Sequence, residues 1–197
     1  MTPTANRPSA SAPSAARQRI LETAYELFSR NGIRSVGIDR IIAEARVAKM
    51  TLYNHFPAKA DLALAFLDLR EERWTRGWLQ SEIERLATSP RDRLLVPFDA
   101  LDEWFHRDDF EGCSFVNTLL ETHGSDPLHQ AAVRHLALIE DLIEGYAEEA
   151  GVADPEEIAL QLQTLIMGSI VSAGRGDREA ARRARGVAEL LLDHGTP

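Results

Sequence analysis

The chain has 197 residues, of which 44% are hydrophobic and 27% charged. This composition suits one or two globular domains and excludes collagen-like, disulfide-scaffold and wholly disordered proteins. The formal net charge of -9 argues against a nucleic-acid partner, because phosphates are bound by clustered lysines and arginines. Residues 1–60, however, hold nine basic and four acidic side chains and carry +5, which leaves -14 for the remainder. This division predicts a basic head that faces nucleic acid on an acidic body, with a chance excess as the alternative.

The N-terminal segment and the single cysteine indicate where the protein works. Cys113 is the only cysteine, so we expect no intramolecular disulfide and a cytoplasmic protein. No apolar run approaches the roughly 18 residues that span a bilayer, so we expect no membrane partner. Residues 1–16 are rich in Pro, Ser, Ala and Thr and are predicted to form a disordered arm. On this arm Arg7 would either enter a DNA minor groove or simply aid solubility.

Three helices are predicted in the head. We place them from about Ala16 to Arg30, from Ser35 as the cap to Ala45, and from Lys49 to Phe56. Asn31-Gly32 supplies a left-handed stop after the first helix, and Pro57 ends the third. Two short helices joined by a three-residue turn, with a longer helix in front, are typical of a helix-turn-helix.

The rest of the chain predicts further helices and no strands, so the expected fold class is all-α. A connecting helix of roughly thirty residues should begin at Ala58 or Lys59 and run towards Ala87. Later helices are expected over Pro90–Phe105, about Cys113–Glu121, from Asp126-Pro127 to Gly151, from Asp154-Pro155 to Ala173, and after the Gly174–Gly176 break.

The last two helices are predicted to form a homodimer interface. The helix after Asp154-Pro155 is apolar over more than one stripe and should be buried on two sides. The final helix carries small or apolar residues at helical spacing: Ala180, Ala184, Val187, Ala188 and Leu191. Because such residues permit close packing, we expect these helices to pair with their copies in a four-helix bundle. The alternative is that they only close the core of one chain.

The third head helix is predicted to enter the DNA major groove. At 100° per residue Leu52 and Phe56 face inward, and Met50, Thr51 and Asn54 face outward. Asn can read an adenine edge, Thr can contact a thymine methyl or a phosphate, and Met offers an apolar contact.

Residues suited to phosphates surround this outward face. They are Tyr53, His55 and Lys59, with Lys49 on one flank and Arg34 and Arg46 nearby. The helix N-termini expected near Ser35 and Lys59 should add backbone N–H donors. Each of these residues taken alone also fits an ordinary surface position of an amphipathic helix. Together with the helix-turn-helix spacing they favour DNA binding.

The head resembles a known family. The run from Arg19 to Leu62, above all Thr51-Leu52-Tyr53-Asn54-His55-Phe56 followed by Lys59, looks like the TetR/AcrR family of bacterial transcriptional regulators. The resemblance implies a helix-turn-helix domain over 17–60 and an all-helical ligand-binding and dimerisation domain over 61–197. It also implies a homodimer that binds a palindromic operator in double-stranded DNA and releases it when a small-molecule effector enters the second domain. We expect this homodimer to be a repressor.

The family pattern also bears on single residues. Thr51, Tyr53 and His55, with Lys59, match its DNA-contacting positions, while Lys49 and Met50 stand where base contacts vary between members. Two residues depart from the pattern.

Arg46 stands where the family commonly has Gly, so the turn must accommodate a side chain, which would add a phosphate contact. Ala48 stands where a Ser often caps the recognition helix, and losing such a cap costs about 0.5–2 kcal/mol.

An effector pocket is expected among the large side chains of the second domain. The candidates are Trp78, Trp104, Phe105, Phe110, Phe115, Tyr146 and Met167; ordinary core packing is the alternative for each. A buried Glu121 or Asp102 would select a cationic effector. A cavity of a few hundred Å³ would favour a ligand sensor, and a solid core would favour a constitutive DNA-binding protein whose second domain only dimerises.

Chemistry at other residues is a further alternative. Cys113 lies near an expected helix start, where a thiolate is favoured, so a thiol-based redox or electrophile sensor competes with an inert buried thiol. His123, His129 and His135 are six residues apart, which spreads them around a helix and predicts no metal site. The sequence has no glycine-rich phosphate loop, nucleophile elbow or metal-ligand spacing, so we expect no cofactor and no enzymatic activity.

Overall fold

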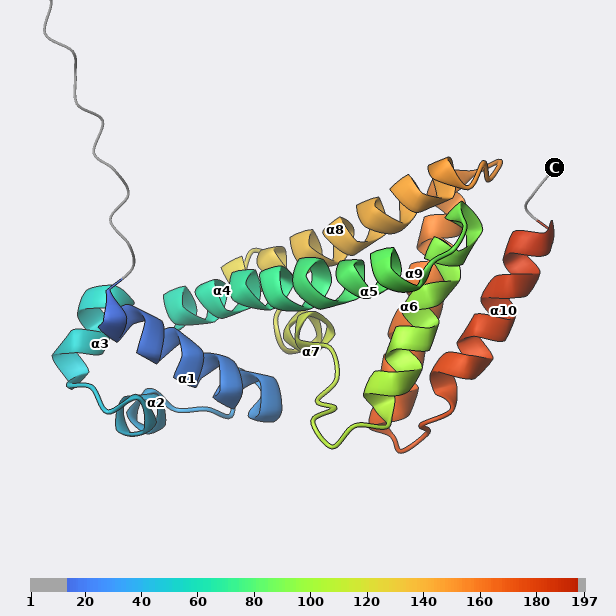
Figure 1. Cartoon of the computed structure of the whole chain (residues 1–197). Helices are drawn as coiled ribbons and strands as arrows, with labels where there is room; N and C mark the ends of the chain where they lie inside the picture. Colours follow the sequence, from blue (N-terminus) through green and yellow to red (C-terminus); the bar gives the residue numbers. More distant parts are fainter. Residues whose placement is uncertain (1–13, 195–197) are drawn as a thin grey trace, which may run out of the picture.

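The computed structural model describes residues 14–194 and contains no strand over that range, so the predicted all-α fold is confirmed. The head comprises α1 (Ala15–Asn31), α2 (Ile38–Ala45) and α3 (Lys49–His55). A long helical connector follows, made of α4 (Lys59–Arg70), the π-helical segment η1 (Glu71–Leu79) and α5 (Gln80–Leu86). The body adds α6 (Pro90–Phe105), α7 (Ser114–Glu121), α8 (Pro127–Glu149), α9 (Pro155–Gly174) and α10 (Ala180–His194). Figure 1 shows the head as a lobe at one end of the connector, with α10 at the far end.

Helix α1 begins slightly earlier than the sequence pattern indicated. The arm was predicted to extend to Ala16, but the helix starts at Ala15 because the Ser14 hydroxyl accepts a hydrogen bond from the backbone N–H of Arg17 at 3.2 Å. The remainder of the predicted arm, including Arg7, lies outside the described residues.

Three body helices begin with the same local device. A side-chain oxygen caps the helix and a proline occupies its first turn: Ser89-Pro90 for α6, Asp126-Pro127 for α8 and Asp154-Pro155 for α9. The three proline starts were predicted, whereas the cap at Ser89 was not. Proline is well tolerated there because the first-turn N–H groups have no partner within the helix. These caps make the boundaries of the body helices readable from the sequence.

The connector is one uninterrupted helical run, but its middle turns are not α-helical. The segment η1 has π-helical hydrogen bonding, which the sequence pattern did not predict. A Cβ atom added at Gly77 would lie 3.1 Å from the carbonyl oxygen of Glu72, so the absence of a side chain suits this close backbone approach. Segments of this kind are frequent at functional sites. Here it carries Trp74 and Trp78, whose ring centroids are 5.2 Å apart.

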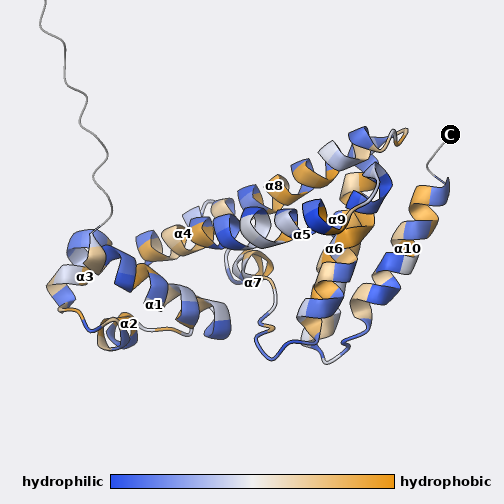
Figure 2. Ribbon diagram, in the orientation of Figure 1, coloured by the Kyte–Doolittle hydropathy of each residue, from blue (hydrophilic) through white to orange (hydrophobic). Residues whose placement is uncertain are grey.

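The small residues of α10 face the chain's own core, which corrects one reason for the predicted dimer. Ala180, Ala184 and Ala188 are buried, and α10 packs against α6 and α9. Figure 2 shows hydrophobic residues concentrated where α6 and α9 lie together. Close approach of small side chains therefore serves packing within the body. Of the predicted stripe, Val187 is the member that remains exposed.

A buried histidine joins the body to the connector. His135 on α8 stacks on Phe115, with ring centroids 5.0 Å apart, and its Nε2 lies 3.3 Å from a carboxylate oxygen of Asp68 on α4. Burial lowers the pKa of His135, while Asp68 and Glu71 oppose that shift and Arg134 adds to it. The folded chain thus favours the neutral imidazole more than the unfolded chain does.

This pKa shift predicts a pH-dependent stability. Because the folded-state pKa is lowered, the contribution of neutral His135 is complete above the ordinary imidazole pKa of about 6.5 and is lost as the pH falls from there through the lower folded-state pKa. We expect the loss of thermal stability between about pH 7.5 and about pH 5 to be smaller in His135→Gln than in wild type. The exposed His123→Gln serves as the control, and equal slopes in all three proteins would contradict the assignment.

Candidate DNA-binding site

The helix-turn-helix is held against α1 by buried apolar side chains. Ile41 of α2 and Leu52 of α3 are fully buried, and Phe56, which follows α3, is 2% exposed. The guanidinium of Arg17 lies over the Phe56 ring, 4.9 Å from its centroid, where a cation–π attraction holds the start of α1 against the end of α3. With this face committed to the core, α3 presents only its opposite face to solvent.

The turn between α2 and α3 contains a strained residue. Arg46 has φ = 52° and ψ = 51° and is the only non-glycine residue with positive φ among residues 14–194. Its N–H donates to the Ala43 carbonyl, and that of Val47 donates to the Ile42 carbonyl, both at 3.3 Å. The turn therefore does accommodate a side chain where glycine is common. The expected absence of a side-chain cap at Ala48 is also confirmed.

The outward face of α3 is the one predicted from helical spacing. Met50 is 71% and Tyr53 37% exposed, and Lys49 and Asn54 are exposed as well. Thr51 is half-buried at the edge of this face. A long apolar side chain exposed to water beside an amide and an ammonium group is well suited to base edges flanked by phosphates.

Two predicted phosphate ligands already have partners within the chain. His55 Nε2 lies 3.1 Å from the Ser14 hydroxyl at the start of α1. Lys59 Nζ donates to the Arg34 carbonyl at 3.4 Å, and partial burial lowers the pKa of Lys59, an effect that the nearby Glu121 carboxylate opposes. These contacts position both side chains at the boundary of the exposed face, where they join α3 and α4 to neighbouring parts of the head.

The predicted cap of α2 is wrong. The capping position is Gly37, not Ser35, and it makes no side-chain hydrogen bond. The reason is that Val36 is fully buried in the core of the head and Gly37 after it has an extended backbone, so the helix begins only at Ile38. Ser35 instead lies exposed in the preceding turn beside Arg34.

The start of α4 also differs from expectation. The backbone N–H of Ala58 donates to the Asp61 carboxylate at 2.8 Å. This helix N-terminus therefore already faces an anionic side chain, which weakens its suitability as a second backbone phosphate site.

A buried ion pair at the junction of head and body was not predicted from the sequence. Arg70, the last residue of α4, is 5% exposed. Its Nη1 donates to Glu111 at 2.5 Å, to the Tyr25 hydroxyl at 3.1 Å and to the Ser29 hydroxyl at 3.5 Å. The available signal was an arginine on the apolar stripe that also carries Ala63 and Phe66. A charge at such a position needs partners from neighbouring elements.

The candidate effector residues do not line one pocket. Phe105 and Phe115 are fully buried core side chains, and Tyr146 is also buried, beneath the Arg93 guanidinium. Met167 lies on an enclosed apolar cavity of about 20 Å³, which is room for about one water molecule. Trp78 and Trp104 lie on a cleft of about 310 Å³ between head and body.

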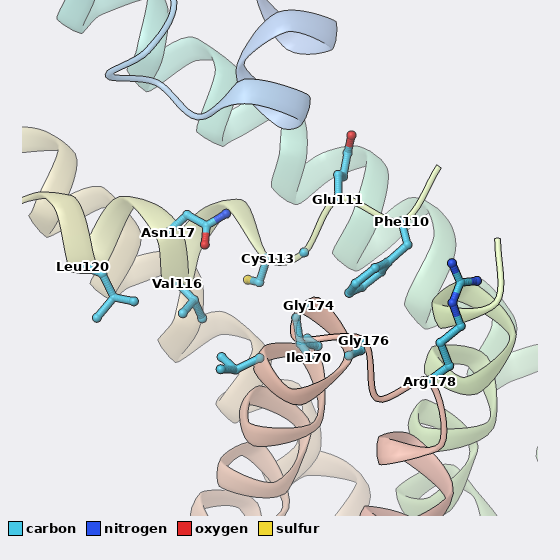
Figure 3. Close-up of a pocket in the computed structure, with 13 residues that line it drawn as sticks. Phe110, Glu111, Cys113, Val116, Asn117, Leu120, Ile170, Gly174, Gly176 and Arg178 are labelled. Carbon is cyan, nitrogen blue, oxygen red and sulfur yellow. The ribbon is translucent and has the colours of Figure 1, made fainter. Parts of the chain in front are cut away.

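Phe110 lies on a second, open cleft of about 580 Å³ between the loop before α7 and the end of α9. Figure 3 shows Phe110, Cys113 and Arg178 around this space. Of the three described pockets that contain predicted effector residues, this cleft has the largest volume. It is bordered by Leu120, which is 71% exposed.

The structure opposes two of the chemical alternatives. Burial raises the pKa of the Cys113 thiol, the opposite of the lowered pKa that a thiolate sensor requires. Asp102 pairs with Arg182 at 3.1 Å and is therefore not an unpaired anion awaiting a cationic effector. Glu121 is half-buried near Lys59 and Gly32, away from the aromatic candidates. Over residues 14–194, no three His, Cys, Asp or Glu side chains gather as a metal site.

Comparison with known proteins shows which family shares this fold and this helix-turn-helix. Residues 20–66 match the family model described as bacterial regulatory proteins, tetR family. The crystal structure of SCO4454, a TetR-family transcriptional regulator from Streptomyces coelicolor, is 30% identical and superposes with a TM-score of 0.85 over 95% of this chain and 93% of that one. The chain belongs to the TetR family of transcriptional regulators.

Other members of the TetR family match over shorter stretches. The HTH-type transcriptional regulator QacR of Staphylococcus aureus is 32% identical over 34% of this chain and 36% of its own length. The HTH-type transcriptional repressor SCO4008 of Streptomyces coelicolor is 32% identical over 58% of this chain and 46% of its own length. The chain thus matches less than half of either curated relative. These relatives are transcriptional regulators and not enzymes, and no helix within residues 14–194 of this TetR-family chain is long and apolar enough to cross a membrane.

The strained turn gives a prediction that separates stability from DNA binding. Arg46→Gly removes the side chain from a left-handed backbone, so we expect the free energy of unfolding to rise by about 1 kcal/mol. If the guanidinium contacts a phosphate, the slope of log K against log salt should become less steep by about 0.9 per head. The measurements are chemical denaturation and a salt titration of DNA binding. Arg46→Lys keeps charge and strain and should match wild type, whereas an unchanged slope in Arg46→Gly would remove Arg46 from the DNA interface.

Proposed function

We propose that this TetR-family protein is a ligand-responsive repressor that binds a palindromic operator as a homodimer in the cytoplasm. The observation that carries the DNA-binding part is the exposed face of α3, with Met50 and Asn54 facing outward from a helix that Leu52 holds in place. Asn54 and Met50 would contact base edges, and Tyr53 and Lys49 the flanking phosphates.

Further phosphate contacts are proposed around that face. Arg46 would reach the backbone from the turn, and Thr51 and His55 from the edge of α3, where they are half-buried. Lys59 would contact the phosphates from the start of α4, with Arg34 and Ser35 exposed in the turn before α2. Because two heads together hold many such contacts, affinity should fall steeply with salt.

The homodimer is proposed to form through α9 and α10. Their outward faces keep large apolar side chains exposed, namely Leu160, Val171, Val187 and Leu190. Helix α9 packs against α8, α6 and α10 on its other sides, so a second copy on the outward face would bury it on a further side. A two-fold axis there would pair like faces and present two heads to an inverted repeat.

The effector-responsive part is supported by open space near candidate residues. The clefts of about 310 Å³ and 580 Å³ lie beside Trp78 and Trp104 and beside Phe110 respectively. Glu111 lines both clefts and accepts a hydrogen bond from Arg70. Arg70 also donates to Tyr25 and Ser29 of α1, so a hydrogen-bond network joins the clefts to the head. A ligand that prefers one arrangement of this network would shift the population of head orientations.

A constitutive DNA-binding protein is the second candidate function. The enclosed cavity near Met167 has a volume of only about 20 Å³, which is what a body used solely for dimerisation would show. Binding of any small molecule that changes DNA affinity would separate the two candidates.

The proposed function is tested by selecting tight-binding duplexes from a random library with the full-length protein. We expect inverted repeats, because each head should read one half-site. Tyr53→Ala should weaken binding to all selected duplexes alike, by about tenfold, since it removes a phosphate contact. Asn54→Ala should instead reduce discrimination at one base position of each half-site by about 1–3 kcal/mol.

Gln130→Ala, an exposed amide on α8, is the matched control and should leave both affinity and preference unchanged. Selected sequences without inverted symmetry would contradict the homodimer. An unaltered base preference in Asn54→Ala would show that Asn54 does not read a base.

A further inference from the structure

The cleft of about 310 Å³ is built from both parts of the molecule. One wall comes from α1 of the head, with Tyr25, Ser29 and Arg30. The other walls come from the connector and from the end of α6 and the loop that follows it. Any occupant would therefore touch the head and the body at once, which the small cavity inside the body does not allow.

All three tryptophans of the sequence gather at this cleft. The ring centroid of Trp74 lies 5.2 Å from that of Trp78 and 5.6 Å from that of Trp104, and the last two are 6.1 Å apart. The ring planes are tilted against one another by 49°, 57° and 56°, and together they offer aromatic surface against which a planar ring can pack. Two of these tryptophans belong to the π-helical segment η1, so the unusual backbone geometry coincides with this wall.

One donor in the wall has no acceptor. The indole Nε1 of Trp74 is buried and makes no hydrogen bond within the structure. Buried polar groups are nearly always hydrogen-bonded, so this indole N–H lacks the acceptor that it would normally have. Trp74 borders both this cleft and the small apolar cavity of the body, and only the cleft has room for a ligand that carries one.

The charges around the cleft cancel. Its residues include three arginines, Arg30, Arg70 and Arg107, and three carboxylates, Glu26, Asp109 and Glu111. Arg70 is paired with Glu111 at 2.5 Å, and Arg107 with Asp109 at 2.6 Å. The remaining two charges, Arg30 and Glu26, are of opposite sign, so the lining as a whole is neutral and favours an uncharged ligand.

We propose that this cleft binds an uncharged planar aromatic molecule whose hydrogen-bond acceptor, a carbonyl oxygen or a ring nitrogen, takes the N–H of Trp74. This deepens the effector part of the proposed function, and its consequence for DNA rests on that function. The consequence follows from position, because Tyr25 and Ser29 in the wall are also the partners of Arg70. An occupant held between them and the tryptophans would bias the angle between head and connector.

The test uses the full-length protein and two probes of similar shape. Coumarin is planar and uncharged and carries a carbonyl acceptor, whereas naphthalene is planar and carries none. We expect coumarin to bind more tightly than naphthalene in ligand-observed NMR titrations. Trp74→Phe keeps an aromatic ring and removes the donor, so it should weaken coumarin binding about two- to tenfold and leave naphthalene binding unchanged.

Two further variants locate the site. Trp78→Phe also loses an indole N–H but retains that of Trp74, and it should keep the preference for coumarin. Arg30→Trp introduces bulk from the α1 side at an exposed position and should abolish coumarin binding, because Arg30 borders this cleft and not the cavity inside the body. Equal binding of the two probes, no binding of coumarin, or full binding in Arg30→Trp would each overturn the proposal.

The effect on DNA is measured separately on a duplex selected by the wild-type protein. Coumarin should lower affinity for that duplex in wild type and do so less in Trp74→Phe. Binding of coumarin in the cleft without any change in DNA affinity would leave the site in place and overturn its role as the effector site. Failure of the protein to select any duplex would instead contradict the proposed function, whatever the probes show.

Discussion

The guanidinium of Arg70 is almost completely removed from water, and a buried charge of this kind persists only when neighbouring groups neutralise it and accept its hydrogen bonds. Its partners come from separate parts of the chain. Glu111 belongs to the loop between α6 and α7, while Tyr25 and Ser29 belong to α1. Removing one partner would leave an unpaired buried charge, so the contact constrains the geometry even if its net contribution to stability is small. The relative placement of head, connector and body depends on this requirement.

Other contacts at the junction act in the same direction. Phe66 of α4 meets the rings of Phe28 and Tyr25 of α1, with centroids 5.5 Å and 5.7 Å away. Arg73 at the start of η1 forms a second ion pair with Glu22 of α1 at 2.5 Å. That pair is largely exposed and contributes little by comparison. The head is thus held mainly by the apolar contacts around Phe66 and by the buried charge of Arg70, both on the connector. A ligand between them would act where the constraint is concentrated.

The exposed face of α3, which we propose binds DNA, could be predicted because its determinants are local. Spacing along one short helix decides that Leu52 is buried and that Asn54 faces outward, and no distant residue alters this. The same holds for Asp126-Pro127, where cap and proline fix a helix start within a few residues. Ser35 failed as a cap because burial of Val36, a tertiary effect, moved the helix start to Ile38.

The proposed effector site could not be predicted in the same way. Aromatic residues at helical spacing look alike whether they fill a core, as Phe105 does, or line a cleft, as Trp78 does. The difference is set by which elements meet across the space, and for Trp78 the opposite wall is α1, more than forty positions earlier in the chain. The π-helical turns of η1 and the inward direction of the alanines on α10 are likewise results of packing.

The most direct test of the central role of Arg70 is hydrogen exchange, helix by helix, in Glu111→Gln compared with wild type. We expect the amides of α1 and of the loop around Glu111 to lose protection first, because the buried guanidinium loses its counter-charge, while those of α9 keep theirs. Adding Arg70→Met to the same chain should restore much of the protection, since no unpaired charge then remains. Unchanged exchange in α1 of Glu111→Gln, or an equal loss of protection in every helix, would contradict the claim that this ion pair fixes the head against the body.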